Sequence, residues 1–345
     1  MSKGKIYRVG IAGSGFGAKV HVPAFAAHPR FEVVALASPN RAAEIAKERG
    51  IRHAFANCAE MLAGCDLDAV SIAAPPFTHY DDVMAACAAR KHILCEKPFA
   101  LTVAQAESMR DAGKAAGTAC GVAHEFRWVP ERIAVKELIV NGHLDPLREI
   151  EITQLAGWLR AGGDRPRGWW FERERGGGLA GALLSHIIDN ATWLVGRPPL
   201  RSTGMIRTAN PERTDKDGAF TSTVDDGAFA LVDYGRGVVG RLSCDATAAV
   251  ESFTLSAHGE NRTAVASGLN MTDLQLFSVD DDETSELQCK PSPYAKFESI
   301  NGNVPLFMHL LDAFAEQIDT GNSDLPTFEE AVHTQRVLAS IGYGG

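Results

Sequence analysis

The length, composition and charge of the chain exclude several classes of protein. Its 345 residues suit one large domain or two ordinary ones, and 45% hydrophobic with 22% charged residues is usual for a globular protein. A formal charge of -9 leaves no excess of basic side chains to neutralise the phosphates of a nucleic acid. No apolar run approaches the roughly 18 residues of a membrane-spanning helix, and the first residues lead directly into an expected strand, so we expect neither a membrane protein nor a signal peptide.

The first 125 residues alternate between expected strands and expected helices. The apolar or β-branched strand segments are residues 6–12, 31–37, 69–74, 92–95 and 119–123. The first expected helix ends near residue 27. Three more are expected at residues 41–49, 81–90 and 102–116. This alternation is typical of βαβ units with a parallel sheet, so we predict an α/β domain over residues 1–125.

The pattern changes after about residue 125, where strands come to dominate. A helix is expected at residues 130–140, and two more at residues 306–320 and after Thr327. The expected strands are residues 148–158, 228–234, 238–244, 253–258, 263–266 and 274–279. The glycines at 235 and 237 are a strong hairpin signal between two of them. We predict a second domain over residues 126–345, α+β with an antiparallel sheet, whose last helices can pack back on the first domain.

The cysteines indicate a reducing compartment. Seven are scattered along the chain, an odd number, and no pair has the spacing Cys-x-x-Cys. This pattern is typical of reduced thiols and not of a disulfide framework or a zinc site, so we expect a cytoplasmic protein. No cluster of His, Cys and Asp has the spacing of metal ligands, so we expect no metal.

A glycine-rich turn follows the first expected strand and opens the first expected helix. It reads Gly13-Ser14-Gly15-Phe16-Gly17-Ala18, the Gly-x-Gly-x-x-Gly/Ala form with Ala18 in the third slot. The first glycine permits a tight turn, the second lets the backbone approach a pyrophosphate, and a small third residue lets helix and strand pack closely. The helix N-terminus favours phosphates. We predict a bound dinucleotide; the alternative is a glycine turn without a ligand.

The residues at the end of the second strand indicate which dinucleotide, NAD or NADP, is bound. An acidic residue usually holds the ribose 2′-hydroxyl of NAD there, but the sequence reads Ala37-Ser38-Pro39-Asn40-Arg41. Ser38, Asn40 and Arg41 can instead donate hydrogen bonds to a 2′-phosphate. We therefore predict NADP in preference to NAD. The alternative is that Arg41 is a solvated residue in the first turn of a helix.

Lys97 follows a short apolar strand, in the sequence Cys95-Glu96-Lys97-Pro98. The carboxyl end of a strand in a nucleotide-binding fold is where substrate can meet cofactor. The proline removes a backbone donor and stiffens the turn. Lys97 is therefore a candidate catalytic residue.

A second glycine-rich helix start, residues 176–178, precedes His186. Apolar residues recur at helical spacing on one face: Ala180, Leu184, Ile187, Ile188 and Ala191. Polar or aromatic residues share another face: His186, Asp189, Asn190 and Trp193. We expect the apolar face to pack on the sheet and the polar face to look into a cleft. The alternative for His186 is a structural histidine.

Lys97 and His186 have the chemistry that oxidation of a carbinol needs. Hydride must leave carbon and a proton must leave oxygen; a neutral histidine can take the proton, and an ammonium can stabilise the developing alkoxide. Lys97 could itself be the base, because a buried lysine beside a cationic cofactor has a lowered pKa. Asp189 either binds substrate hydroxyls, orients His186, or is structural.

Three further side chains are candidate substrate contacts. Trp169 and Trp170 have faces that suit the C–H faces of a sugar ring, although such a pair also suits packing or an oligomer interface. Arg127 can reach substrate oxygens or pair with Glu125 or Glu131. His21 and His124 are interpreted as structural.

With the turn at 13–18, Ala74-Pro75-Pro76-Phe77-Thr78-His79, Glu96-Lys97-Pro98 and the glycines before His186, the chain resembles the Gfo/Idh/MocA family (glucose–fructose oxidoreductase, inositol dehydrogenase and relatives). The resemblance covers nearly the whole chain. It implies an N-terminal Rossmann domain and a C-terminal open-faced antiparallel sheet. It also implies reversible oxidation of a carbinol on a sugar or cyclitol with NAD or NADP, and dimers or tetramers formed through that sheet.

The resemblance also implies roles for single residues. Ala74, Pro75, Pro76 and His79 would lie on a loop beside the nicotinamide ribose. Glu96 would contact the nicotinamide end and Lys97 the reacting hydroxyl, with the Lys97–Pro98 peptide often cis.

The chain departs from the family pattern beside His186. Family members often carry an aspartate where this chain has Ala182, and a glycine where it has Leu184. The usual Lys-Asp-His set is thus reduced to Lys97 and His186. Two alternatives to a dehydrogenase follow: a cofactor-recycling sugar lyase or glycosidase of the same fold, and a non-catalytic NAD(P)-binding sensor.

Overall fold

The computed structural model describes residues 4–161, 165–268, 273–279 and 285–344, and the chain divides into two compact units. Unit 1 comprises Met1–Glu125 and Ser292–Val332. Unit 2 comprises Phe126–Pro291 and His333–Gly345. Across the described residues, no helix is both long and apolar enough to cross a membrane.

Unit 1 is built on a six-stranded sheet in which every neighbouring pair is parallel. The strands are β1 (Tyr7–Ala12), β2 (Phe31–Ala37), β3 (His53–Phe55), β4 (Ala69–Ile72), β5 (His92–Cys95) and β6 (Cys120–Val122). Their order, β3-β2-β1-β4-β5-β6, is that of a doubly wound dinucleotide-binding domain. The predicted α/β class is confirmed, and the order reverses between β1 and β4, where ligands bind in such folds.

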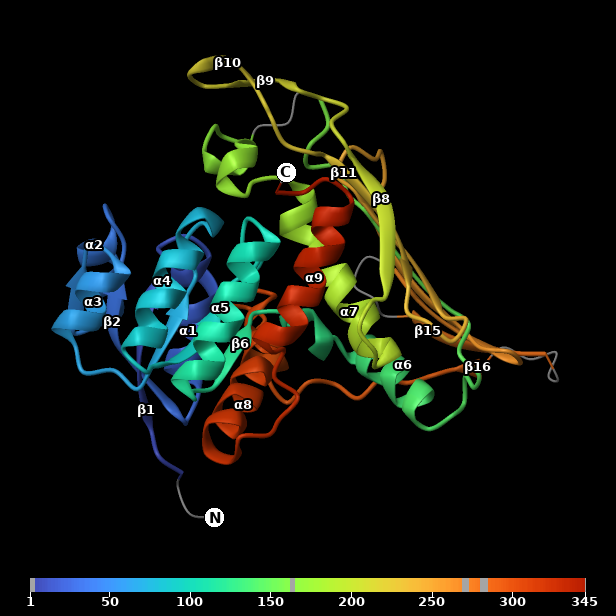
Figure 1. Ribbon diagram of the computed structural model, residues 1–345, viewed down its shortest axis with the longest axis horizontal. Helices are drawn as coiled ribbons and strands as arrows, with labels where there is room; N and C mark the ends of the chain where they lie inside the picture. The colour runs from blue at the N-terminus through green and yellow to red at the C-terminus, as the bar shows by residue number, and fades with distance from the viewer. Residues whose placement is uncertain (1–3, 162–164, 269–272, 280–284, 345) are drawn as a thin grey trace. The chain divides into compact units, whose positions relative to one another are not determined.

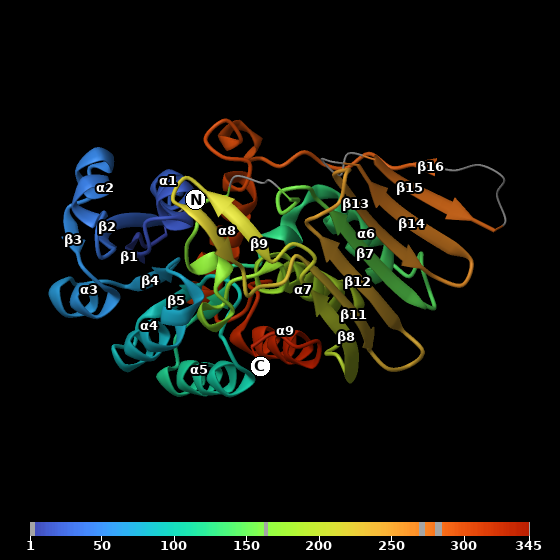
Figure 2. The ribbon, with the colours of Figure 1, turned by 90° about the horizontal axis from the view of Figure 1, so that it is seen from above.

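Helices cover both faces of this sheet. The helices assigned wholly to unit 1 are α1 (Val22–Ala27, after a π-helical turn at Gly17–His21), α2 (Ala42–Arg49), α3 (Cys58–Gly64), α4 (Pro76–Ala88), α5 (Val103–Ala116) and α8 (Val304–Thr320). Figure 2 shows α1 and α8 on one side and α4 and α5 on the other. The Phe307 ring of α8 lies 4.2 Å from the His21 ring and 6.1 Å from the Phe25 ring, so α8 packs on α1.

Two helices differ from the prediction in ways that local chemistry explains. Helix α4 begins at Pro76, five positions before the expected start at Asp81. A proline at the first helical position gives up only an N–H that has no partner within the helix, so Pro75 can precede the helix and Pro76 can begin it. The short strand β3 and helix α3 were not predicted. Asn57 caps α3 by accepting from the backbone N–H of Glu60.

Unit 2 is built on an eight-stranded sheet in the order β16-β15-β14-β13-β7-β12-β11-β8. The strands are β7 (Glu149–Leu155), β8 (Arg201–Arg207), β11 (Gly227–Asp233), β12 (Val239–Asp245), β13 (Ser252–His258), β14 (Arg262–Ser267), β15 (Asp273–Ser278) and β16 (Ser285–Glu286). The predicted antiparallel sheet is confirmed apart from one pair: all neighbours are antiparallel except β7 and β12, which are parallel. The chain leaves β7, forms α7, β8 and β11, and returns as β12 in the direction of β7.

Two helices lie on one face of this sheet (Figure 1). They are α6 (Pro130–Val140) and α7 (Ser185–Val195), and a π-helical turn, Ala180–Leu184, leads into α7. Ile187 and Ile188 of α7 share one buried cluster with Ile152 and Leu242 of the sheet. A small hairpin of β9 (Glu212–Asp215) and β10 (Gly218–Thr221) stands apart from the sheet, and helix α9 (Phe328–Ser340) begins in unit 1 and ends in unit 2.

Candidate active site

The residues expected to form the site fall into two groups, one in each unit. The glycine turn after β1 leads the group in unit 1. Gly13 has φ +123°, and a Cβ there would lie 2.2 Å from the carbonyl oxygen of Ala73, so only glycine fits. Nothing lies within 4 Å of the place where a Cβ on Gly15 would stand. That open space beside exposed backbone is what close approach of a pyrophosphate needs, so the turn fits a dinucleotide.

Close packing of the helix on the strand is visible at Gly17, the residue before the predicted Ala18. Gly17 is buried, and a Cβ there would lie 3.2 Å from the Cβ of Ala73 and 3.5 Å from Cγ2 of Ile11. Ala18 is half-buried.

The residues after β2 provide hydroxyl and cationic groups. The hydroxyl of Ser38 donates to the hydroxyl of Ser14 at 2.8 Å, so the two serines join the glycine turn to the end of β2. Asn40 and Arg41 are exposed, and Arg41 lies 3.6 Å from Glu44 in the first turn of α2. The position after β2 that usually carries an acidic residue is occupied by Ser38.

Glu96, after β5, is held by a buried histidine. Nε2 of His21 lies 3.0 Å from Glu96 Oε1, and Nδ1 lies 2.8 Å from the hydroxyl of Ser71 in β4. A carboxylate only accepts hydrogen bonds, so Nε2 carries the proton. Burial acts to raise the pKa of Glu96, but the hydrogen bond and charge of His21, with Lys97 and His79, outweigh it and lower that pKa. Glu96 is thus an ionised carboxylate fixed under the turn, and His21 has more than a packing role.

The family resemblance implied that His79 lies on a loop, but the structure places it in a helix. It is fully buried within α4, with Nδ1 3.0 Å from the carbonyl oxygen of Pro98 and Nε2 2.9 Å from that of Ala74. Both ring nitrogens therefore face the backbone, and burial lowers the pKa of the ring. His79 ties the loop after β4 to the turn after β5. Pro76 is also buried in α4, which leaves Ala74 and Pro75 half-buried beside the sheet edge.

Lys97 differs from its neighbours in exposure. Every residue from Ile93 to Ala100 is buried except Lys97, which is half-buried. Its backbone N–H donates to Glu96 Oε2 at 3.2 Å, and the Lys97–Pro98 peptide is cis, as the resemblance implied. The turn therefore presents one side chain, an amine, at the carboxyl end of β5.

In unit 2, the glycines before α7 fit around Asp225. Gly178 has φ +106°, and a Cβ there would lie 2.4 Å from Oδ1 of Asp225. Oδ2 of Asp225 accepts from the backbone N–H of Ala180 at 2.6 Å, which satisfies a donor at the start of the helix. Burial raises the pKa of Asp225 to about 6. Asp225 was not predicted as a site residue, because nothing in the sequence around it marks it as a buried cap.

Asp189 and Arg127 bind each other. Nε of Arg127 donates to Oδ2 of Asp189 at 2.8 Å, and Nη2 donates to Oδ1 at 2.6 Å. Both residues are buried, with 3% and 1% of their surface exposed. Arg127 was expected to contact substrate or to pair with Glu125 or Glu131, and the structure gives it Asp189 as a two-point partner. Asn190 is also buried and accepts from Arg132 of α6, so the buried polar residues of α7 meet the segment at residues 126–132.

His186 lies against an aromatic ring from that same segment. The rings of His186 and Phe126 stack with centroids 4.1 Å apart and planes 21° apart. Only 2% of His186 is exposed. Ala182, one turn earlier on the chain, is half-buried.

Trp169 and Trp170 lie in different environments. Trp170 belongs to the buried core of unit 2, and the guanidinium of Arg165 lies 4.2 Å from the centre of its ring. Its carbonyl oxygen would be 2.2 Å from a Cβ on Gly177, so it also shapes the glycine triplet. Trp169 is half-buried. Packing therefore accounts for Trp170, and Trp169 is the better candidate for a ligand contact. Among the described residues, no three His, Cys, Asp or Glu side chains are placed to hold a metal ion.

The doubly wound sheet, the open backbone at Gly15 and the amine at the end of β5 define a dinucleotide-binding protein of the oxidoreductase type. A family model described as "Oxidoreductase family, NAD-binding Rossmann fold" matches residues 7–124. A model described as "GFO/IDH/MocA C-terminal domain" matches residues 133–265. The chain belongs to the Gfo/Idh/MocA family, and its N-terminal part is an NAD-binding Rossmann domain.

Individual relatives agree with this assignment. Levoglucosan dehydrogenase of Pseudarthrobacter phenanthrenivorans is 30% identical over 278 residues, which are 73% of this chain and 68% of that protein. An uncharacterized oxidoreductase of Synechocystis is 36% identical over 217 residues, 62% of this chain and 58% of that protein. A solved structure of levoglucosan dehydrogenase with NADH and levoglucosan is 26% identical, with a TM-score of 0.86 over 98% of this chain and 96% of the other.

Proposed function

We propose that the protein is an NAD(P)-dependent oxidoreductase that interconverts a carbinol and a carbonyl on a sugar, sugar derivative or cyclitol. The observation that carries the proposal is Lys97, the half-buried amine in an otherwise buried turn at the carboxyl end of β5 in an NAD-binding domain. Relatives with names in this class support it: levoglucosan dehydrogenase, D-glucoside 3-dehydrogenase of Escherichia coli and scyllo-inositol 2-dehydrogenase (NADP(+)) of Bacillus subtilis.

Lys97 and His186 handle the proton of the reacting hydroxyl in this proposal. NAD(P) supplies the hydride acceptor at its nicotinamide ring. Neutral His186 accepts the proton as the hydroxyl ionises, and the Lys97 ammonium stabilises the alkoxide. In the reverse direction His186 returns that proton to the carbonyl oxygen. Glu96 and His79 contribute by holding the turn that carries Lys97.

NADP is the preferred cofactor in this proposal. The position that usually carries an acid has Ser38, and the exposed side chains of Asn40 and Arg41 follow it. The exposed Arg41–Glu44 pair, at 3.6 Å, is of a kind that contributes little, so Arg41 can turn to a 2′-phosphate. The scattered free cysteines support a place in the cytoplasm.

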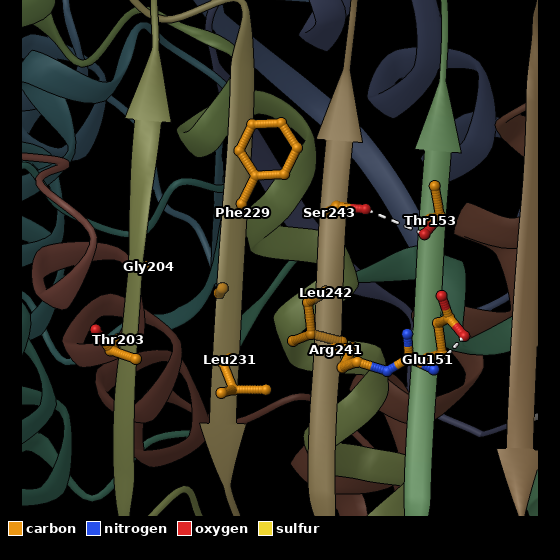
Figure 3. A pocket seen from close by; sticks show the side chains of 10 residues that line it. Glu151, Thr153, Thr203, Gly204, Phe229, Leu231, Arg241, Leu242 and Ser243 are labelled. Carbon is orange, nitrogen blue, oxygen red and sulfur yellow. Dashed lines mark hydrogen bonds and ion pairs between the residues drawn. The ribbon is translucent and has the colours of Figure 1, made fainter.

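The outer face of the unit 2 sheet is the proposed contact between copies of the chain. A hollow of about 370 Å³ on this sheet is lined by Phe229, Leu231, Thr203, Ser243 and Arg241 (Figure 3). Leu231 is 49% exposed and Met205 57%, while Arg241 pairs with Glu151 at 2.8 Å beside them. Apolar side chains with polar ones at their border are typical of a protein interface. We propose a homodimer or homotetramer through this face, tested by light scattering of the native protein and of Leu231→Arg.

The function is tested by turnover with both cofactors. Purified protein is given NAD or NADP with levoglucosan, scyllo-inositol or a methyl glucoside, and the absorbance of the reduced nicotinamide is followed. The expected result is that one of the sugars is oxidised while NAD or NADP is reduced. Product without net reduced cofactor would instead favour a cofactor-recycling lyase or glycosidase, and tight NADPH binding without any turnover would favour a sensor.

A further inference from the structure

The ring of Phe126 stacks on the ring of His186, although the two residues are far apart in the sequence. Phe126 lies in the short helical turn Glu125–Trp128, and His186 lies in α7. Their stacked rings, with centroids 4.1 Å apart, are in van der Waals contact across almost parallel planes. Phe126 is half-buried and packs against the buried cluster of unit 2.

Arg132 fixes the Phe126 ring in place. Its guanidinium lies 5.3 Å from the centre of the Phe126 ring and 4.7 Å from that of Phe253, two contacts of the cation–π kind. Its Nη1 donates to the carbonyl oxygen of Phe126 at 3.4 Å and to Oδ1 of Asn190. Asn190 is one helical turn after His186 in α7. The buried arginine therefore joins the Phe126 backbone, the Phe126 ring and the helix of His186.

A histidine side chain needs such a partner to have a defined ring plane. The torsion that turns its ring is broad, so rotamer preference alone does not set the plane. A group that exchanges a proton must be oriented to within roughly 10–20°. We infer that Phe126, held by Arg132, is a positioning residue that sets the plane of the His186 imidazole. This inference rests on the proposed role of His186 in proton transfer.

Three variants distinguish the effect of the aromatic face of Phe126 from the effect of its apolar volume. Phe126→Leu keeps apolar volume but has no ring face, and Phe126→Tyr keeps the face. Phe297→Leu is the matched control, because Phe297 is also half-buried and stacks on a ring, that of Tyr294, but in unit 1. Turnover is measured with levoglucosan, or with whichever sugar of the panel above reacts faster, and NADH affinity by fluorescence titration.

We expect Phe126→Leu to lower kcat by roughly 10- to 100-fold, the scale of a small misplacement of a reacting group. We expect KM and NADH affinity to stay within about threefold, because ground-state binding is unaffected. Phe126→Tyr should recover kcat to within about threefold of native, and Phe297→Leu should leave it unchanged. A native kcat in Phe126→Leu, or equal losses in the Leu and Tyr variants, would overturn the inference.

The stack is also measurable without turnover. Ring currents of Phe126 shift the imidazole C–H resonances of His186, which are assigned by their loss in His186→Gln. The shift should vanish in Phe126→Leu and remain in Phe126→Tyr; an unchanged shift in the Leu variant contradicts the stack itself. If His186→Gln has native turnover, both the proposed function of His186 and this inference fail. If that variant is inactive while Phe126→Leu is native, only the inference fails.

Discussion

The carboxylate of Asp189 receives two hydrogen bonds from the guanidinium of Arg127, at 2.6 and 2.8 Å, with both side chains almost fully buried. Planar, two-point pairing of this kind is the strongest geometry for an arginine and a carboxylate. The pair joins helix α7 to the segment that precedes α6. It therefore stabilises the place from which His186 projects, and neither partner is positioned as a substrate ligand.

Removal of one partner is expected to destabilise the fold. Arg127→Met or Asp189→Leu alone leaves a buried charge without its counter-ion, which costs about 3–5 kcal/mol of unfolding free energy. The double variant should recover much of that loss, because two apolar groups can replace a buried ion pair at little cost. Urea unfolding of the three variants measures the difference. Equal stability of the single variants and native protein would show that the pair is not structural.

Lys97→Ala and His186→Ala are each expected to lower kcat by at least roughly 100-fold, the usual scale for a positioned acid–base group. NADH affinity should change little, since neither side chain is part of the glycine turn. Lys91→Ala and His258→Ala are matched controls, because both residues are half-buried and lie outside the proposed site. Native turnover in Lys97→Ala would remove Lys97 from the mechanism.

The fold of unit 1 could be predicted because the sequence patterns that specify it lie within short segments of the chain. Alternating apolar strands and helices, and the glycines between β1 and the first helix, together specify a doubly wound sheet. The mixed character of the second sheet could not be read in this way. The pairing of β7 with β12 joins segments about 90 residues apart, and strand composition does not encode the direction of a distant partner.

The sequence could name candidate site residues but not the partners that surround them. The structure keeps Lys97 accessible and His186 against a defined partner. Asp189 and Arg127 have the right chemistry for a substrate, but a sequence does not show that two polar residues 62 positions apart satisfy each other. The same holds for His21, which binds Glu96 across 75 positions. Burial and pairing, not residue type, decided these roles.

Cofactor preference is expected to depend on Arg41. Arg41→Ala should weaken NADPH binding about 10-fold, the worth of one charge-assisted hydrogen bond, and leave NADH within about twofold. Ser38→Asp should reverse the preference, because a carboxylate accepts from a 2′-hydroxyl and repels a 2′-phosphate. Parallel fluorescence titrations measure both. Arg49→Ala is the control, an exposed arginine at the other end of α2; equal NADPH affinity in Arg41→Ala and Arg49→Ala would refute the preference.

The pH dependence of stability is expected to report on Asp225. Burial raises its pKa from 3.8 to about 6, so the folded state holds a proton that the unfolded state has released between those values. Stability therefore falls as pH rises through that window and then stays lower by a constant amount, on the order of 3 kcal/mol. Asp225→Asn removes the titration but keeps an oxygen that accepts from Ala180 N–H.

The measurement is the unfolding free energy of native protein and Asp225→Asn in urea from about pH 3 to pH 8, a range that spans the shift. The stability of the Asp225→Asn variant relative to native protein should rise across the window and level off above about pH 6. Asp217→Asn, an exposed acid in the same unit, reports the effect of removing a charge alone. A difference that is flat with pH would mean that Asp225 titrates as an ordinary carboxyl. The helix start that precedes His186 would then not depend on its protonation.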